Sequence, residues 1–127
     1  PRIVRGEIGR VYKELGGAES DLGLPIDGDE VKLARGAFQR FEHGAIYWTP
    51  ETGAQPVRSN DITDHWGSTG YENGPFGYPV GPLQPVKAGG LEQQFEGGWI
   101  RQLNGKIVEE RNKPEAPAPA ADNGDDK

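Results

Sequence analysis

The sequence predicts a small α+β protein, mostly β, built as a tandem repeat in which one short helix precedes an antiparallel β-hairpin or three-stranded meander. Two observations support this fold class. When the chain is aligned with itself at a shift of 54 residues, 11 of the 39 positions from 8 to 46 are identical, and such periodicity is the sequence signature of a repeat architecture. The composition is also rich in turn formers, with 20 glycines, 11 prolines and only 33% hydrophobic residues. This favours short strands and loops over a helical bundle.

Each repeat is expected to begin with a short helix. The apolar residues of the first helix, from about residue 7 to residue 15, follow the i, i+3, i+4, i+7 spacing: Ile8, Val11, Tyr12 and Leu15. Gly16-Gly17 should end it. The second helix is expected over residues 61–68, with Asn60 or Asp61 as the N-cap.

A β-hairpin is expected after each helix. In the first repeat, strands at 37–41 and 45–49 flank His43-Gly44, a predicted two-residue turn, and a third strand should lie near Val57. In the second repeat, the strands are expected at 91–95 and 99–103 around Gly97-Gly98, followed by a last strand at Ile107-Val108.

The repeat period also predicts the division of the chain. Residues 1–58 form the first repeat, including a leading strand at 3–6 that matches the third strand of a preceding copy. Residues 59–112 form the second repeat, and residues 113–127 are a Pro/Ala and acidic tail that we expect to be disordered. Because the chain begins in mid-period, it is either cut from a longer array or closed in a ring by its first strand.

The charge balance argues against two classes of partner. The formal net charge is −6, and residues 109–127 alone contain six acidic and three basic residues. Without a basic face, we expect no nucleic acid partner and no attraction to anionic lipid. The sequence contains no apolar run long enough for a transmembrane segment.

The chain offers little that could support catalysis or hold a metal. It has no Gly-x-Ser-x-Gly motif, no cysteine, and two histidines in different repeats. Residues Asp27 to Glu30 look like a cation loop but lack the spacing of an EF-hand. We therefore expect no enzymatic activity, no metal and no cofactor, while cation binding by Asp27 to Glu30 stays open.

Two four-residue segments resemble the element that names the LGFP repeat. Their members are Leu22, Gly23, Leu24 and Pro25 in the first copy, and Phe76, Gly77, Tyr78 and Pro79 in the second. We expect these residues to be structural, because Gly and Pro at these positions shape a tight turn that lets consecutive units approach. The resemblance covers about residues 4–108, although the second copy departs from it with Arg101-Gln102 where Tyr47-Trp48 stand.

The resemblance implies a source, a location and a role. Repeats of this family are found in secreted cell-envelope proteins of actinobacteria, and longer arrays look like small propellers, so a propeller-like or partial-propeller arrangement is expected. The implied function is non-catalytic binding of cell-wall polysaccharide, similar to arabinogalactan, that anchors a secreted protein at the wall. The alternative is a structural or protein-interaction module that assembles with further LGFP-like repeats or with an envelope protein.

Glycan binding requires aromatic faces for sugar rings and polar groups for their hydroxyls. The candidates of both kinds are Arg40, His43, Tyr47, Trp48, Tyr71, Gln94, Trp99 and Arg101. Trp99 is favoured because the first copy has Ala45 there, and Tyr71 because it replaces Gly17. Strand alternation allows only one of Tyr47 and Trp48 to point inward. The bulky residues that recur in both copies are expected in the core: Tyr12, Trp66, Phe41, Phe95, Ile46 and Ile100.

Overall fold

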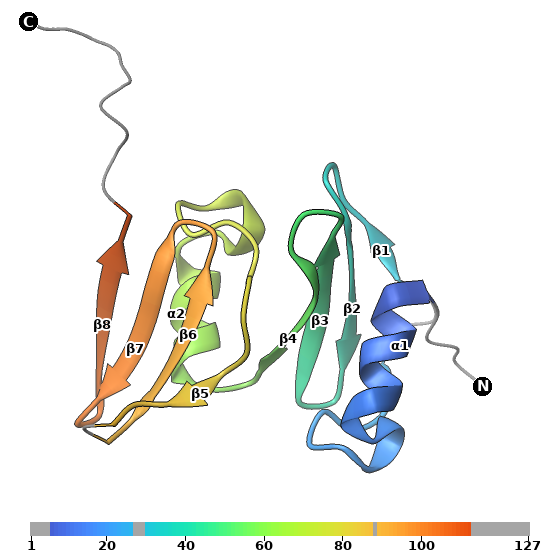
Figure 1. The fold of residues 1–127 in the computed structure, drawn as a ribbon, viewed down its shortest axis with the longest axis horizontal. Helices are drawn as coiled ribbons and strands as arrows, with labels where there is room; N and C mark the ends of the chain where they lie inside the picture. The colour runs from blue at the N-terminus through green and yellow to red at the C-terminus, as the bar shows by residue number, and fades with distance from the viewer. Residues whose placement is uncertain (1–5, 27–29, 88, 113–127) are drawn as a thin grey trace, which may run out of the picture.

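The computed structural model describes residues 6–26, 30–87 and 89–112. Over these residues the chain folds into two helices and two antiparallel four-stranded sheets (Figure 1). The predicted tail at 113–127 and residues 3–5 of the predicted leading strand lie outside the described residues. Gly6, the last residue of that predicted strand, is instead the first residue of the first helix.

The elements follow each other in the same order in two structural units, which we call the first unit and the second unit. The first unit contains α1 (Gly6–Leu15), the 3-10 helix η1 (Gly17–Glu19), β1 (Val31–Lys32), β2 (Ala37–Phe41), β3 (Gly44–Thr49) and β4 (Gly53–Arg58). The second unit contains α2 (Asp61–Ser68), η2 (Tyr71–Asn73), β5 (Gln84–Pro85), β6 (Leu91–Phe95), β7 (Gly98–Leu103) and β8 (Lys106–Arg111). The mostly β, helix-then-hairpin order predicted from the sequence is confirmed.

Each sheet differs from the expected meander by one strand. Strand β1 pairs with β2, and β5 pairs with β6, so that each sheet has four strands in sequential order. Both added strands are only two residues long, which is too short for an alternating pattern to show.

The hairpin turn lies one residue earlier than predicted. Glu42 and His43 form the turn, and Gly44 is the first residue of β3. A Cβ atom on Gly44 would lie 2.2 Å from the backbone oxygen of Val57 on β4. Glycine is therefore required at this position for the close approach of two strands.

The motif segments dock beside the hairpins through the backbone. In the first unit, the amide N–H of Glu42 donates to the Leu24 carbonyl (2.9 Å), and the amide N–H of His43 donates to the Leu22 carbonyl (2.9 Å). The same pair of bonds joins Glu96 to Tyr78 and Gly97 to Phe76 in the second unit. The LGFP-like element thus fastens the loop after each helix to the end of β2 or β6.

Helix α1 covers one face of the first sheet. Ile8 of α1 is buried with Phe41 and Ile46 in one hydrophobic cluster, and Trp48 packs against it. Cross-strand partners share a face, so Trp48 and its partner Ala54 face α1, while Tyr47 faces the other way.

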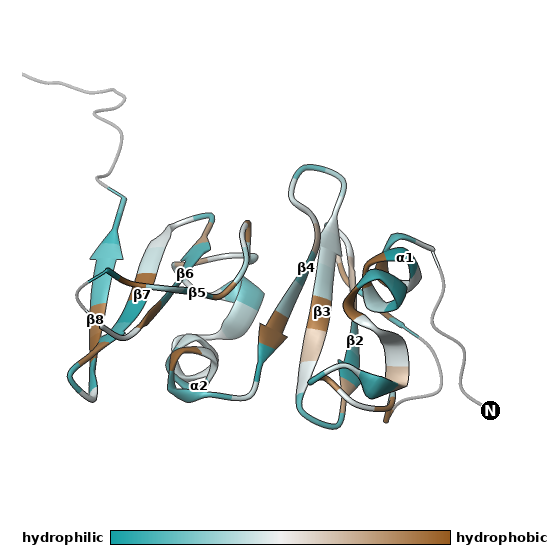
Figure 2. Ribbon diagram, turned by 60° about the horizontal axis from the view of Figure 1, so that its bottom comes forward, coloured by the Kyte–Doolittle hydropathy of each residue, from teal (hydrophilic) through white to brown (hydrophobic). Residues whose placement is uncertain are grey.

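The second unit covers the opposite face of the first sheet. Tyr47 and Val57 of the first unit belong to a cluster with Trp66 and Phe95 of the second unit. The two units therefore pack head to tail and share one core across their junction. Figure 2 shows the hydrophobic segments of β3 and β4 beside the second unit.

Candidate functional site

A cavity of about 460 Å³ lies at the junction of the two units. This volume is in the range of small-molecule sites. Five aromatic residues line it, three from the first unit and two from the second: Phe38, Phe41, Tyr47, Trp66 and Tyr71. The polar side chains of its wall are Arg40, Ser59, Thr63, Asp64 and Glu72. An aromatic wall with a few polar groups is typical of small-molecule binding sites.

The aromatic wall is a continuous series of ring contacts. Phe38 stacks on Tyr47, its cross-strand partner, with ring centroids 4.9 Å apart. Tyr47 meets Trp66 edge-on at 5.0 Å, and Trp66 meets Tyr71 edge-on at 5.4 Å. Burial raises the pKa of the Tyr47 hydroxyl above its ordinary value. Tyr47 is therefore a neutral hydrogen-bonding group at physiological pH.

Tyr71 occupies the edge of the cavity in an uncommon backbone conformation. Its φ is 54°, in the left-handed region, and the residue is 49% exposed. The first unit has Gly17 at the corresponding place, with φ of 63°. A tyrosine in this conformation costs about 1–2 kcal/mol relative to glycine. The second unit therefore carries a half-exposed aromatic ring where glycine would be more stable.

Thr63 supplies a polar group without a partner. Its Oγ1 atom is buried and makes no hydrogen bond within the described part of the chain. Thr63 lines the cavity beside Asp64. A buried hydroxyl gains free energy when a ligand hydroxyl bonds to it, so the cavity has both a stacking surface and an unused polar atom.

A second group of candidates meets on the outer face of the second sheet. The Arg101 guanidinium lies 5.1 Å from the centroid of the Trp99 ring and pairs with Glu92 at 2.8 Å and Glu110 at 2.6 Å. Gln94 is the cross-strand partner of Trp99. Arg101 thus already uses the face of Trp99, which makes this surface a weaker stacking platform than the junction cavity.

The structure separates the remaining candidates. His43 is exposed in the β2–β3 turn. Trp48 is half-buried against the cluster beneath α1, and Tyr47 is 7% exposed in the junction. Adjacent residues of a strand point to opposite faces, and here both faces are covered, so neither ring is a free platform. The cavity brings together only Arg40, Tyr47 and Tyr71 of the eight candidates.

Several junction residues were not found by sequence reasoning. Thr63, Asp64 and Glu72 have ordinary polar identities, and only the packing of the second unit on the first turns them toward the cavity. Phe38 could have been found by strand alternation. It lies between Ala37 and Gln39, and so on the face opposite the α1 core, where an aromatic residue indicates a contact.

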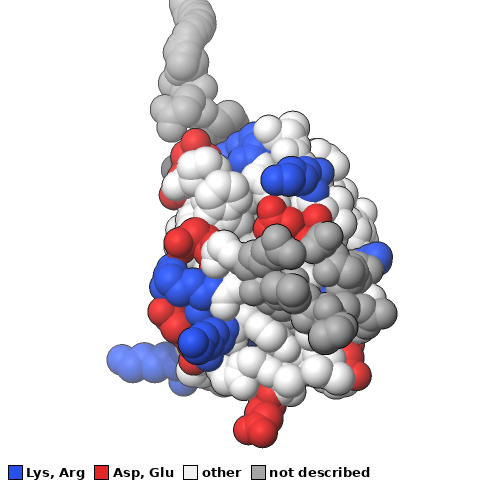
Figure 3. Space-filling model, turned by 90° about the vertical axis from the view of Figure 1, so that its right-hand side faces the viewer, with Lys and Arg blue, Asp and Glu red and all other residues white. Residues whose placement is uncertain are grey.

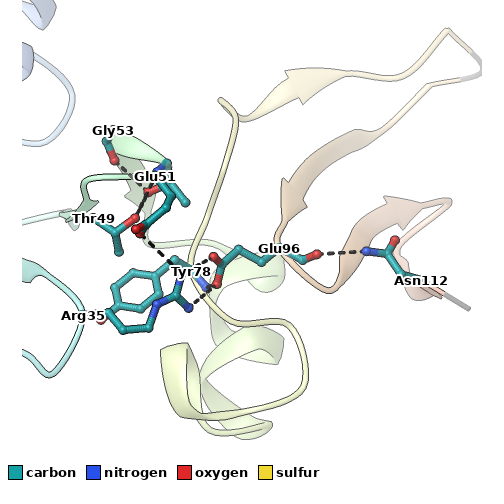
Figure 4. Close-up of polar contacts among 8 residues, drawn as sticks. Arg35, Thr49, Glu51, Gly53, Tyr78, Glu96 and Asn112 are labelled. Atoms are coloured by element: carbon teal, nitrogen blue, oxygen red, sulfur yellow. Dashed lines mark hydrogen bonds and ion pairs between the residues drawn. The ribbon is translucent and has the colours of Figure 1, made fainter. Parts of the chain in front are cut away.

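An ion pair joins the two units across their junction. Arg35 of the first unit binds the Glu96 carboxylate through two bonds, of 2.9 and 2.6 Å, and lies 5.1 Å from the Tyr78 ring centroid (Figure 4). The same carboxylate accepts the Tyr78 amide N–H at 3.0 Å. Arg35, followed by this backbone bond, holds the pKa of Glu96 below its ordinary value.

This shift predicts acid sensitivity at the junction. A carboxyl whose pKa is lowered by folding contributes stability above its unfolded pKa of about 4.3 and loses it as pH falls through the folded pKa. We expect Arg35→Gln to lower the free energy of unfolding at neutral pH and to flatten its decrease between about pH 5 and pH 3. Urea unfolding at several pH values measures this. Arg10→Gln, which removes an exposed ion pair on α1, is the control and should change little. Equal slopes for wild type and Arg35→Gln would contradict the prediction.

No metal site or membrane span is found in the described residues. They contain no group of three or more His, Cys, Asp or Glu side chains placed to hold a metal ion, and none of their helices is long and apolar enough to cross a bilayer. The possible cation loop at Asp27 to Glu30 has three of its residues, 27–29, outside the described part.

Two successive units of the same element order, packed head to tail with one shared core, define the protein as a tandem-repeat module. The LGFP repeat family model matches residues 22–74, so this segment of the chain contains an LGFP repeat. The matched segment begins at the motif element Leu22 and runs through the first sheet and α2. It thus includes both walls of the junction cavity. A search of curated proteins found no match.

Proposed function

We propose that this protein is a non-catalytic module that binds envelope polysaccharide, similar to arabinogalactan, and so retains a secreted actinobacterial protein at the cell wall. The observation that carries the proposal is the junction cavity. It joins a half-exposed aromatic ring, Tyr71, to an unpartnered buried hydroxyl, Thr63, and to the acidic side chains Asp64 and Glu72.

The chemistry of the cavity favours a neutral polyhydroxylated ligand. The edge of Trp66 is already covered by Tyr71, so Tyr71 itself is the ring available for a sugar face. The carboxylates of Asp64 and Glu72 accept hydrogen bonds from hydroxyl groups, and the guanidinium of Arg40 donates them. A strongly anionic ligand would meet repulsion from the two carboxylates.

The experiment is a pull-down of the purified chain with mycolate-free actinobacterial cell wall, with peptidoglycan alone as the control. We expect retention on the arabinogalactan-bearing wall and at least a tenfold loss of affinity for Tyr71→Gly, because a stacking interaction of about 1.4 kcal/mol or more is removed. Tyr71→Gly introduces the residue that the first unit has at this φ, and the relief of backbone strain should offset much of the lost ring contact with Trp66. Urea unfolding of the variant, followed by circular dichroism, separates a loss of binding from a loss of folding.

Trp99→Ala is the matched variant for the outer face of the second sheet. If Trp99→Ala abolishes retention and Tyr71→Gly does not, the polysaccharide binds the outer face and the cavity is not the site. If the wild type is not retained at all, polysaccharide anchoring by these two units is wrong.

The second candidate function is a structural or protein-interaction module. The head-to-tail junction favours it, because one unit binds its neighbour through a surface that further repeats could use in the same way. Continued addition of units would generate the propeller-like or partial-propeller arrangement. A complex with an envelope protein that survives Tyr71→Gly would favour this function over polysaccharide binding.

A further inference from the structure

The junction uses different surfaces of the two units. The first unit contributes a sheet face, and the second contributes its helix and motif side. An interface of this kind leaves one unused surface at each end. The leading face belongs to the first unit and consists of Gly9, Tyr12, Leu24, Pro25, Gln39 and Glu42. The trailing face belongs to the second unit and consists of Glu92, Trp99, Arg101 and Glu110.

The leading face keeps the apolar positions that are covered in the second unit. Leu24 corresponds to Tyr78, which is 3% exposed in the junction, whereas Leu24 is 54% exposed. A cavity of about 380 Å³ lies between Tyr12 and Leu24. Their counterparts in the second unit, Trp66 and Tyr78, contact the Tyr47 ring of the first unit. Figure 3 views this end of the molecule, and among its described residues acidic and basic side chains both appear, with neither sign of charge dominating.

Gln39 gives a second, independent sign of a missing neighbour. Its counterpart Gln93 is fully buried and donates from Nε2 to two backbone oxygens: that of Pro56, on the edge strand of the preceding unit, at 3.0 Å, and that of Gly81 in its own unit at 3.1 Å. Gln39 is equally buried, at 1% exposed, but its Nε2 has no hydrogen-bond partner among the described residues. A buried amide donor without an acceptor is costly, and a neighbouring edge strand would provide the acceptor.

Glu42 shows the same incomplete pattern. Its Oε1 accepts the Leu24 amide N–H at 2.9 Å, as Glu96 does for Tyr78. Glu96 also binds Arg35 of the preceding unit. Glu42 has no arginine partner within the described part of the chain, so its carboxylate is placed for an arginine that a preceding unit would supply.

The trailing face is built differently and does not match the leading face. In the first unit, the cross-strand partners Phe38 and Tyr47 form the stacked pair that enters the junction. At the same register position of the second unit, the partners are Glu92 and Arg101, which form an ion pair. Charged side chains on the outer sheet are typical of a terminal capping repeat.

We propose that the leading face docks another repeat unit of the first-unit type, one that presents a stacked aromatic pair, an arginine and an edge-strand carbonyl oxygen, whereas the second unit closes the array. This inference is independent of polysaccharide binding. It also predicts that copies of this chain do not polymerise with each other, because burying Glu92 and Arg101 against Leu24 and Tyr12 would remove charges from water without new partners.

The test converts the trailing face into the missing partner. The full-length double variant E92F/R101Y places the aromatic pair of the first unit on the second unit. Sedimentation velocity over a concentration series should show head-to-tail oligomers for this variant and monomers for the wild type. Adding Leu24→Asp to the double variant should restore the monomer. Excess wild type should cap the oligomers and shorten them, and wild type carrying Leu24→Asp should not.

Two outcomes would overturn the proposal in this experiment. The first is a folded double variant, with unchanged circular dichroism, that stays monomeric. The second is oligomers that persist with Leu24→Asp, because they would form through another surface.

A second measurement does not depend on the folding of the double variant. Gln39→Leu removes an unpaired donor and should raise the midpoint of urea unfolding, whereas Gln93→Leu removes a bonded donor and should lower it. If both substitutions lower the midpoint to the same extent, Gln39 already has its partner and the leading face is complete.

Discussion

Replacing Trp66 with alanine should destabilise the protein by about 3–5 kcal/mol, since this is the usual cost of deleting a fully buried large aromatic side chain. Trp66 is 0% exposed and lies at the centre of the junction. Its ring contacts Tyr47 of the first unit at 5.0 Å and Phe95 of the second at 5.1 Å. Its Nε1–H donates to the Gly77 carbonyl at 2.9 Å. The substitution therefore affects both units at once.

Two further variants separate the causes. Trp66→Phe keeps an aromatic ring but leaves the Gly77 carbonyl without its donor. Its free energy of unfolding should fall by the cost of the smaller ring and by about 1–2 kcal/mol more for the lost hydrogen bond. Trp99→Ala removes a half-exposed tryptophan from the outer face and should cost within about 1 kcal/mol. Urea unfolding followed by far-UV circular dichroism measures all three. A cost for Trp66→Ala no greater than that for Trp99→Ala would mean that the shared core is not formed as described.

Gly77→Ala is expected to cost about 3 kcal/mol, from two causes that can be measured separately. Gly77 has φ of 68°, and an alanine there costs about 1–2 kcal/mol from backbone strain alone. Its Cβ would also lie 2.5 Å from the Glu96 Oε1 atom. The carboxylate would have to move, and its bonds to the Tyr78 amide and to Arg35 would weaken.

Gly53→Ala is the matched control for the strain. Gly53 has φ of 73°, close to that of Gly77, but a Cβ atom there would meet nothing within 4 Å. Its substitution should therefore cost only about 1–2 kcal/mol. In the double variant Gly77→Ala/Glu96→Ala the steric part should vanish, so the two changes should be less than additive. Equal costs for Gly77→Ala and Gly53→Ala would show that the Gly77–Glu96 contact carries no stability.

The local elements could be predicted because their signals lie within a few residues of each other. The helix at Asp61–Ser68 was placed at its observed ends, and the Asn60 side chain caps it by accepting the Thr63 amide N–H at 2.9 Å. The core positions Phe41, Phe95, Ile46 and Ile100 were also predicted, and each is buried. Packing requires a bulky residue in both copies, and this requirement remains visible in the sequence as a match at the 54-residue shift.

The candidate site could be predicted only in part, because it lies between the units. Alternation correctly separated Tyr47 from Trp48, but it could not show that the second unit covers the Tyr47 face and α1 covers the Trp48 face. Tyr71 was selected because it departs from Gly17 of the first copy, and the structure places it at the cavity edge. Thr63 and Glu72 also differ from their counterparts in the first copy, Gly9 and Ala18, but a polar residue in a short helix or loop is too ordinary to indicate a site.

The sequence by itself determined the repeat period, the order of helix and strands, and the positions where bulky side chains or glycines are needed, since each depends on the spacing of near neighbours. The tertiary structure alone decided which faces meet. The Arg35–Glu96 pair joins residues 61 apart. The Phe38–Tyr47 stack and the Glu92–Arg101 ion pair occupy the same register position, and only the head-to-tail packing shows that the stack is covered by a neighbouring unit. Such contacts depend on the relative placement of two folded units, and that placement has no counterpart in local sequence pattern.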